Sequence, residues 1–223
     1  MAKLAPNKAT AATHGASKDA AKDDARSRKA AARREAILSA ALDEFSTRGF
    51  TAARLEDVAV RAGVAKGTIY LHFADKEALF QEIVRTMIVP VIAVVELQPP
   101  PDMPIRQVLN GLVDVFSREV YGTRRRDVIR LMMTEGPRFP ALAEFYYRNV
   151  VERAMLAMRG LLARAVERGE LADDTLLRFP QLIVTPGLFA IIWSGLFDRF
   201  APVDVAALMQ AQLDFFFGKE HPL

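Results

Sequence analysis

The amino-acid sequence predicts an all-α protein of about nine helices, with a three-helix domain near the N-terminus and a larger helical domain after it. Apolar residues recur at spacings of three and four along most of the 223 residues, whereas the two-residue alternation of a half-buried strand is scarce. The hydrophobic content of 51% and this length are sufficient for one or two domains with a core.

Residues 1–24 are expected to be disordered, because they are rich in Ala, Lys, Asp and Ser and contain hardly any large apolar residue. Up to residue 34 the chain has nine basic and three acidic residues, so the net charge of +3 and the pI near 9.3 originate here. Alanine-rich residues 25–34 are expected to begin the first helix. Apolar residues at helical spacing then form its inward face, namely Ile37, Leu38, Ala41, Leu42 and Phe45.

A second, short helix is predicted over residues 55–62. Gly63 directly follows it, at the position where a helix end favours a left-handed residue. The helix is recognised by one apolar stripe, formed by Leu55, Val58, Ala59 and Ala62.

A third helix is predicted from Lys66 onward. Ile69 and Phe73 are four residues apart and face inward together, so the opposite face is left to Gly67, Thr68, Tyr70 and Leu71. Two short helices joined by a tight turn, the second with a polar outward face, form the layout of a helix-turn-helix that reads the major groove of DNA.

The rest of the chain is predicted to form longer helices. One spans residues 75–96, with Asp75 as N-cap and a buried, kinked stretch around Pro90. The others are expected over residues 104–121, 124–134, 141–168, 180–199 and 203–217, with Gly169 closing the third of these. The last two contain more Leu, Phe and Trp than the core of one monomer easily buries.

The run from Gly49 to Phe80, and above all residues 62–80, closely resembles the TetR family of bacterial transcriptional regulators. The resemblance covers residues 33–80. It implies a helix-turn-helix DNA-binding domain over residues 25–80 and a helical effector-binding and dimerisation domain over residues 81–223. It also implies that the last two helices pair with their copies in a homodimer, which places two recognition helices about 34–36 Å apart on a palindromic operator.

The resemblance assigns candidate roles on double-stranded DNA residue by residue. Lys66, Tyr70, His72 and Lys76 match positions that grip the phosphate backbone, and Gly67, Thr68 and Leu71 match positions near base edges. Two departures are present. Ala53 and Arg54 replace the usual Ser or Thr cap of the second helix, unless Thr51 caps a helix begun one turn earlier, and Arg54 is hypothesised to contact a phosphate. Leu71 replaces the aromatic or polar residue that is more usual in the family, and it either packs on a thymine methyl or is merely tolerated at this position.

By the same resemblance the body encloses an apolar cavity for a small hydrophobic effector. Methionine and aromatic side chains make adaptable walls. The candidates are Phe116, Met132, Met133, Phe139, Phe145, Tyr146, Met155, Phe189 and Trp193. At helical spacing, however, each is more often simply core. Residues 124–126, three arginines in a row, are read as a solvated helix start rather than an anion site.

Other functions are disfavoured by the sequence. The chain contains no cysteine, so disulfides and thiolate metal sites are excluded, and a reducing cytoplasm is expected. The N-terminus lacks the apolar run of a secretory signal, and residues 182–197 are too short for a comfortable membrane span. Catalytic motifs such as HExxH, GxSxG or a P-loop are missing, so we expect no enzyme, metal or cofactor.

The expected function is a DNA-binding transcriptional regulator, most simply a repressor that a hydrophobic effector releases from its operator. A helical small-molecule-binding protein with a non-functional DNA-binding head is the alternative. A regulator that activates, or that responds to no ligand, also stays open. The basic N-terminal tail either adds salt-dependent phosphate contacts or is a solubilising segment or a misassigned start.

Overall fold

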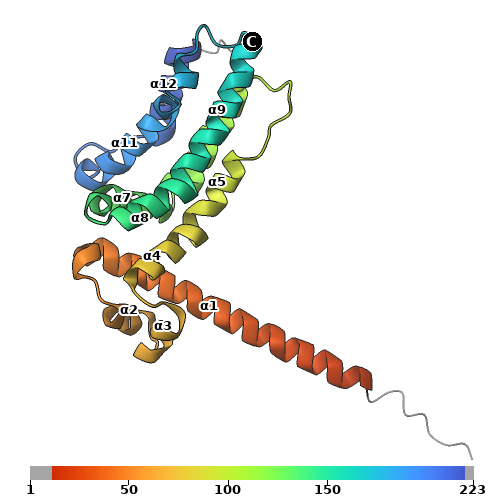
Figure 1. The fold of residues 1–223 in the computed structure, drawn as a ribbon, viewed down its shortest axis with the longest axis vertical. Helices are drawn as coiled ribbons and strands as arrows, with labels where there is room; N and C mark the ends of the chain where they lie inside the picture. The colour runs from red at the N-terminus through yellow and green to blue at the C-terminus, as the bar shows by residue number, and fades with distance from the viewer. Residues whose placement is uncertain (1–11, 219–223) are drawn as a thin grey trace, which may run out of the picture.

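The computed structural model describes the backbone of residues 12–218 and the side chains of residues 24–218. This part of the chain is helical and contains no strand, which confirms the all-α prediction. A head at one end holds α1 (Ala12–Ala52), α2 (Leu55–Ala62) and α3 (Lys66–His72), and a body of longer helices extends from it (Figure 1).

One long helix connects head and body. It consists of α4 (Lys76–Ile83), the π-helical turn η1 (Val84–Ile88) and α5 (Val89–Val95). Asp75 caps its start as predicted, because its carboxylate accepts the N–H of Ala78 at 2.7 Å. Length and composition alone would allow this helix to cross a membrane, but Leu79, Phe80 and Ile83 lie in the head core.

The remaining elements form the body, and three of its helices contain π-helical or 3-10 segments. In chain order they are α6 (Ile105–Val115), η2 (Phe116–Tyr121), α7 (Arg125–Glu135), η3 (Gly136–Arg138), α8 (Pro140–Tyr146), η4 (Tyr147–Val151), α9 (Glu152–Glu167), α10 (Thr175–Arg178), α11 (Gln181–Phe197) and α12 (Val205–Phe217). The short α10 and the 3-10 turn η3 were not predicted from the sequence.

The N-terminal prediction needs a correction. Residues 12–24 are helical as the first turns of α1, so the expectation of disorder up to residue 24 is wrong for them. Alanine and lysine are strong helix formers, and this intrinsic preference outweighs the lack of apolar residues. The expectation for residues 1–11 lies outside the described residues.

The linker around Pro90 also differs from expectation. Ile88 and Ile92 are buried as predicted, but Pro90, Ala93 and Val94 are exposed, because no described segment covers this face of α5. Pro90 is the second residue after the π-helical turn, and the proline and the turn both interrupt the regular pattern of backbone hydrogen bonds.

Two cores hold the molecule together. The first fills the head and continues along the linker helix into α7, and at its centre the rings of Phe45, Phe50 and Phe80 contact one another with centroids 5.0–6.4 Å apart. The second lies among α6, α9, α11 and α12. Because the first core crosses from head to body, the two parts are packed against each other and are not joined by a linker alone.

Candidate nucleic-acid interface and internal cavity

The helix-turn-helix has the geometry that the sequence predicts. Gly63 ends α2 with φ of 66°, a left-handed conformation that glycine adopts without strain. Ile69 and Phe73 are buried, whereas Tyr70 and Leu71 are exposed by 46% and 84%. Gly67 is exposed, and a Cβ there would meet nothing within 4 Å, so the backbone at the start of α3 is open to close approach. Thr68 is half-buried on the edge of this surface.

No side chain caps the start of α2, as the departure in the sequence predicts. Arg54 is the N-cap residue and is exposed, and its side chain caps nothing. Ala53, the residue before this N-cap, is buried in the head core. The alternative in which Thr51 caps an earlier start is wrong, since α2 begins at Leu55 with Arg54 as its N-cap residue, and the backbone before it is broken at Gly49, where φ is 75°.

Glu56 of α2 binds two of the predicted DNA-contacting side chains. Its Oε1 atom accepts a hydrogen bond from the Tyr70 hydroxyl at 3.0 Å and lies 2.9 Å from Nζ of Lys66. The Lys66 ammonium is the main cause that lowers the pKa of Glu56 to about 2, and the Tyr70 hydroxyl adds to it. In return the carboxylate raises the pKa values of Lys66 and Tyr70. All three groups are solvent-facing.

Lys76 is engaged inside the head. Its ammonium donates to the carbonyl oxygens of Phe50 and Thr51 at 2.8 and 2.9 Å and lies 5.0 Å from the centre of the Phe50 ring. These carbonyls lie at the end of α1, where no further turn supplies a donor. One of the three ammonium protons is therefore left for a phosphate. His72, at the end of α3, is exposed.

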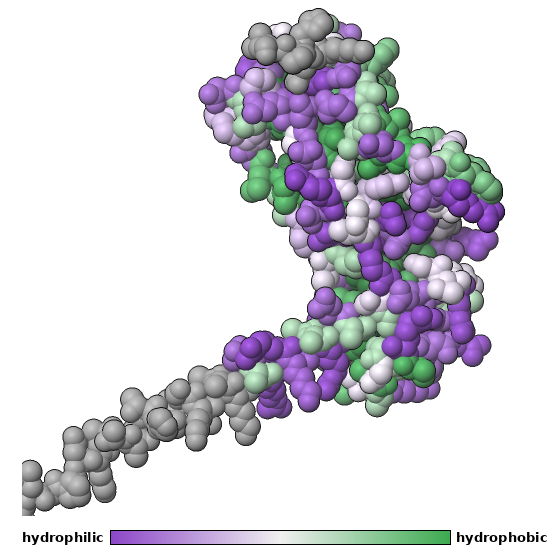
Figure 2. All heavy atoms as spheres, turned by 180° about the vertical axis from the view of Figure 1, so that it is seen from behind, coloured by the Kyte–Doolittle hydropathy of each residue, from purple (hydrophilic) through white to green (hydrophobic). Residues whose placement is uncertain are grey.

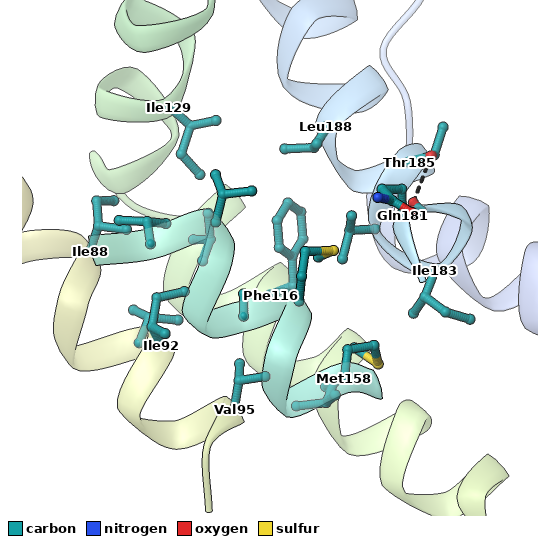
Figure 3. Close-up of a pocket in the computed structure, with 18 of the residues that line it drawn as sticks. Ile88, Ile92, Val95, Phe116, Ile129, Met158, Gln181, Ile183, Thr185 and Leu188 are labelled. Atoms are coloured by element: carbon teal, nitrogen blue, oxygen red, sulfur yellow. Dashed lines mark hydrogen bonds between the residues drawn. The ribbon is translucent and has the colours of Figure 1, made fainter. Parts of the chain in front are cut away.

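A cavity of about 790 Å³ lies in the body (Figure 3). The linker helix, α6 with η2, α7, η4 with α9, and α11 form its walls, and Phe116 points into its centre. Five predicted residues line it, namely Phe116, Met132, Met133, Tyr146 and Met155. Most of the remaining wall is aliphatic, including Ile88, Ile92, Ile129 and Leu188, and the prediction from Met and aromatic residues did not include these side chains.

Four predicted lining residues are placed elsewhere. Phe139 packs edge-to-face on Phe50 of the head, with centroids 4.7 Å apart, and Phe145 lies under the guanidinium of Arg85 at 4.8 Å. Phe189 and Trp193 contact each other at 5.5 Å on another face of α11. Their residue types suited a cavity wall, but the rotation of each helix turns these side chains to other neighbours.

Tyr146 brings a buried hydroxyl to the mostly apolar wall of the cavity. Its hydroxyl makes no hydrogen bond to a residue that the structure describes, and burial raises its pKa well above the ordinary value. The hydroxyl is therefore protonated at physiological pH and can donate a hydrogen bond to a molecule in the cavity.

The two parts of the chain match two family models. Residues 37–83 match the model described as "Bacterial regulatory proteins, tetR family", and residues 99–211 match "Tetracyclin repressor-like, C-terminal domain". The chain belongs to the TetR family.

Individual TetR-family proteins are similar to different parts of this chain. The transcriptional regulator RutR of Escherichia coli K12 is 46% identical over 76 residues, so the chain spans 34% of RutR. The transcriptional repressor BepR of Brucella suis is 30% identical over 157 residues, which are 66% of this chain and 72% of BepR. The solved SmeT–triclosan complex has a TM-score of 0.69 at 21% identity, covers 83% of this chain and 90% of SmeT, and shows that the fold is shared.

Proposed function

We propose that this protein is a homodimeric transcriptional regulator that binds a palindromic operator and is released from it by a small apolar effector. The observation that carries the proposal is one core that joins an exposed recognition helix to the wall of an apolar cavity. Ile88 and Ile92 belong to both the cavity wall and the helix that leads into the head. A molecule in the cavity therefore acts on the support of the recognition helix.

The DNA-contacting surface is formed by one face of α3 and the residues around it. Phosphates are assigned to Arg54, Lys66, Tyr70, His72 and Lys76, and base edges to Gly67, Thr68 and Leu71. The open backbone at Gly67 and the exposed side chain of Leu71 support this assignment. Leu71 has no polar group, so its contribution to specificity is apolar contact with a thymine methyl.

A second copy of the chain is expected to cover α11 and α12. Phe189, Ile192 and Leu196 form an exposed apolar stripe along α11, and Phe215 of α12 is 84% exposed. Ala207 and Ala211 lie on the same face as Phe215 and are small enough for close helix approach. Substitution of Leu196 by Glu is expected to convert the dimer into a monomer, as measured by light scattering coupled to size exclusion.

The effector is expected to be neutral where it is buried. The cavity has the volume of a typical ligand site, and its wall is mostly aliphatic and aromatic, so burial of a charge there would be costly. The Tyr146 hydroxyl favours a molecule with one hydrogen-bond acceptor. Binding releases DNA only if the effector favours one of two head arrangements, since equal affinity for both would shift nothing.

Fluorescence anisotropy tests the proposal with palindromic duplexes taken from DNA that flanks the gene. We expect salt-sensitive binding, loss of binding in a Lys66→Ala, Tyr70→Ala double variant, and release by an apolar phenol such as the triclosan of the SmeT complex or a related compound. A protein that binds the apolar probe but no duplex at low ionic strength would instead support the ligand-binding alternative with a non-functional head. The relatives reported above are named regulators, which favours a protein without catalytic activity.

A further inference from the structure

The N-terminal part of α1 projects from the head without support from the body. Every described residue from 24 to 36 is exposed, and burial begins at Ile37. The helix runs straight out from the head, past α3, and leaves on the side of the molecule opposite α11 and α12 (Figure 1). At 1.5 Å per residue, residues 24–36 alone extend for about 20 Å.

Three cations share one face of this projection. Arg26, Lys29 and Arg33 follow one another at spacings of three and four residues, so their side chains form a stripe along the helix. All three are exposed, and none forms an ion pair with a residue that the structure describes. The acidic side chain of Asp24 lies on the other face, where it pairs with Arg28 at 3.1 Å.

The stripe lies on the side of α1 that faces the helix-turn-helix. Glu44 comes about three helical turns after Arg33 and so shares its face. In the head, this face contacts α2, because Glu44 pairs with Arg61 at 3.2 Å. Arg34 fixes the base of the projection, since it pairs with Glu82 at 2.6 Å and lies 5.7 Å from the centre of the Phe73 ring at the end of α3.

The composition of the projection indicates the kind of partner. Its largest apolar side chain between residues 24 and 36 is alanine, so there is no apolar face for a protein groove. The space-filling view shows hydrophilic residues where the described part of α1 leaves the head (Figure 2). An unpaired row of Arg and Lys on a rigid helix complements a row of phosphates.

We propose that Arg26, Lys29 and Arg33 bind the phosphate backbone of duplex DNA that flanks the operator, outside the half-site read by α3. This inference rests on the proposed function. The direction follows from the fold, because the expected dimer interface lies on one side of the body and the projection leaves on the other. The contact adds affinity that does not depend on the DNA sequence, and it extends the length of duplex that the dimer covers at both ends of the operator.

The test compares two duplexes that contain the same palindrome. One ends at the half-sites, and the other has about 12 further base pairs of unrelated sequence on each side. The wild-type full-length protein is expected to bind the longer duplex at least tenfold more tightly at moderate salt. In an Arg26→Gln, Lys29→Gln, Arg33→Gln variant this difference disappears, and binding to the short duplex stays within about twofold. The slope of log affinity against log salt on the long duplex becomes shallower by about 5, at ~0.9 for each of three cations in two subunits.

The control is Arg28→Gln, which removes a cation of the opposite, paired face and is expected to keep most of the length dependence. Glutamine favours helices, so all variants are expected to have equal helix content, which circular dichroism checks. Equal wild-type affinity for both duplexes overturns the inference while the proposed function stands. Loss of affinity by the triple variant on both duplexes alike also overturns it. A third contrary result is a triple substitution that weakens binding to anionic lipid vesicles but leaves binding to both duplexes unchanged. A wild-type protein that binds neither duplex overturns the proposed function and this inference with it.

Discussion

The hydroxyl of Tyr70 on the recognition helix donates a hydrogen bond to the carboxylate of Glu56 on α2, at 3.0 Å. The same carboxylate oxygen pairs with Lys66 at 2.9 Å. Two of the three groups on α3 that we assign to phosphates are thus held by an anion with which DNA would have to compete. The Glu56 carboxylate orients the two donors, Lys66 and Tyr70, before DNA binds. It also opposes their contact with the phosphates of any DNA, whatever the base sequence.

Substitution of Glu56 by Gln is expected to raise the affinity for duplexes of random sequence by about three- to tenfold. The amide still accepts the Tyr70 hydroxyl, but it no longer neutralises Lys66, so the salt slope steepens by about 0.9 per subunit. Asp57→Asn is the matched control, because Asp57 pairs with Arg48 of α1 and not with α3. Weaker binding by Glu56→Gln, or an unchanged salt slope, would show that the carboxylate does not compete with phosphate.

The pKa of Glu56 also predicts a pH response. Since this pKa is lowered to about 2, the group loses its charge only when the pH falls toward 2. The ratio of the affinities of wild type and Glu56→Gln is therefore expected to stay constant between pH 5 and pH 8, as measured by anisotropy at fixed salt. A ratio that approaches one at pH 5 would mean that the carboxylate is protonated there and that the contact with Lys66 is weak.

Lys76 and Arg54 are expected to separate stability from DNA contact. Lys76→Met keeps the apolar stem against Phe50 but removes the two hydrogen bonds to the end of α1, so we expect the free energy of unfolding to fall by about 1–3 kcal/mol. Arg54→Gln removes an exposed cation that bonds to no described residue, so it should weaken DNA binding at unchanged thermal stability. Thermal unfolding measures the stability of each variant, and titration with duplex DNA measures its affinity. If Lys76→Met is as stable as the wild type, the role of Lys76 is contact with phosphate alone.

The parts of the molecule that local spacing determines could be predicted from the sequence. The left-handed turn at Gly63, the inward pair Ile69 and Phe73, and the cap at Asp75 each depend on residues within one or two turns. The cavity lining could not be predicted in the same way, because an aliphatic wall such as Ile129 has the same helical spacing as solid core. Only the divergence of helices remote in sequence leaves space there.

The arginines of residues 124–126 show a second limit of sequence reasoning. A run of three cations is typical of a solvated helix start, but here each has a different partner. Arg124 bonds to α1, Arg125 donates to the carbonyl of Met87 at 2.8 Å, and Arg126 lies 5.5 Å from the centre of the Tyr121 ring. The partners of Arg124 and Arg125 are 85 and 38 residues away in the chain, so nothing in the local pattern indicates these two contacts.

Gly187 is expected to control the volume of the cavity. A Cβ at this position would lie 2.7 Å from Cε1 of Phe116, so Gly187→Ala pushes the ring away from α11 and into the cavity. We expect at least tenfold weaker binding of an apolar fluorescent probe, and a change in unfolding free energy between zero and a loss of about 2 kcal/mol. Gly111→Ala is the control, since a Cβ there meets nothing within 4 Å. It should stabilise α6 by about 0.5–1 kcal/mol and leave the probe affinity unchanged. Equal probe binding by both variants would place the probe elsewhere.

The contact between Arg124 and α1 is expected to fix the angle of the head on the body. The guanidinium donates to Oγ of Ser39 at 2.8 Å and pairs with the carboxylate of Asp43, while the next residue, Arg125, holds the linker helix. These groups are partly exposed, so their loss should reduce the unfolding free energy by no more than about 1 kcal/mol. Their effect is positional, because they join the start of α7 to both segments that carry the recognition helix.

Because the sequence has no cysteine, a single His72→Cys substitution gives one spin-labelling site per subunit at the end of α3. Pulsed electron paramagnetic resonance then measures the distance between the two spin labels, one on each head of the dimer. We expect one narrow distribution in the parent variant, a clearly broader one after Arg124→Gln, and little change after Arg126→Gln, whose ring contact stays within the body. A distribution that Arg124→Gln leaves as narrow as before would mean that the shared apolar core, and not the arginine, sets the head angle, because that core is the other connection between α1 and α7.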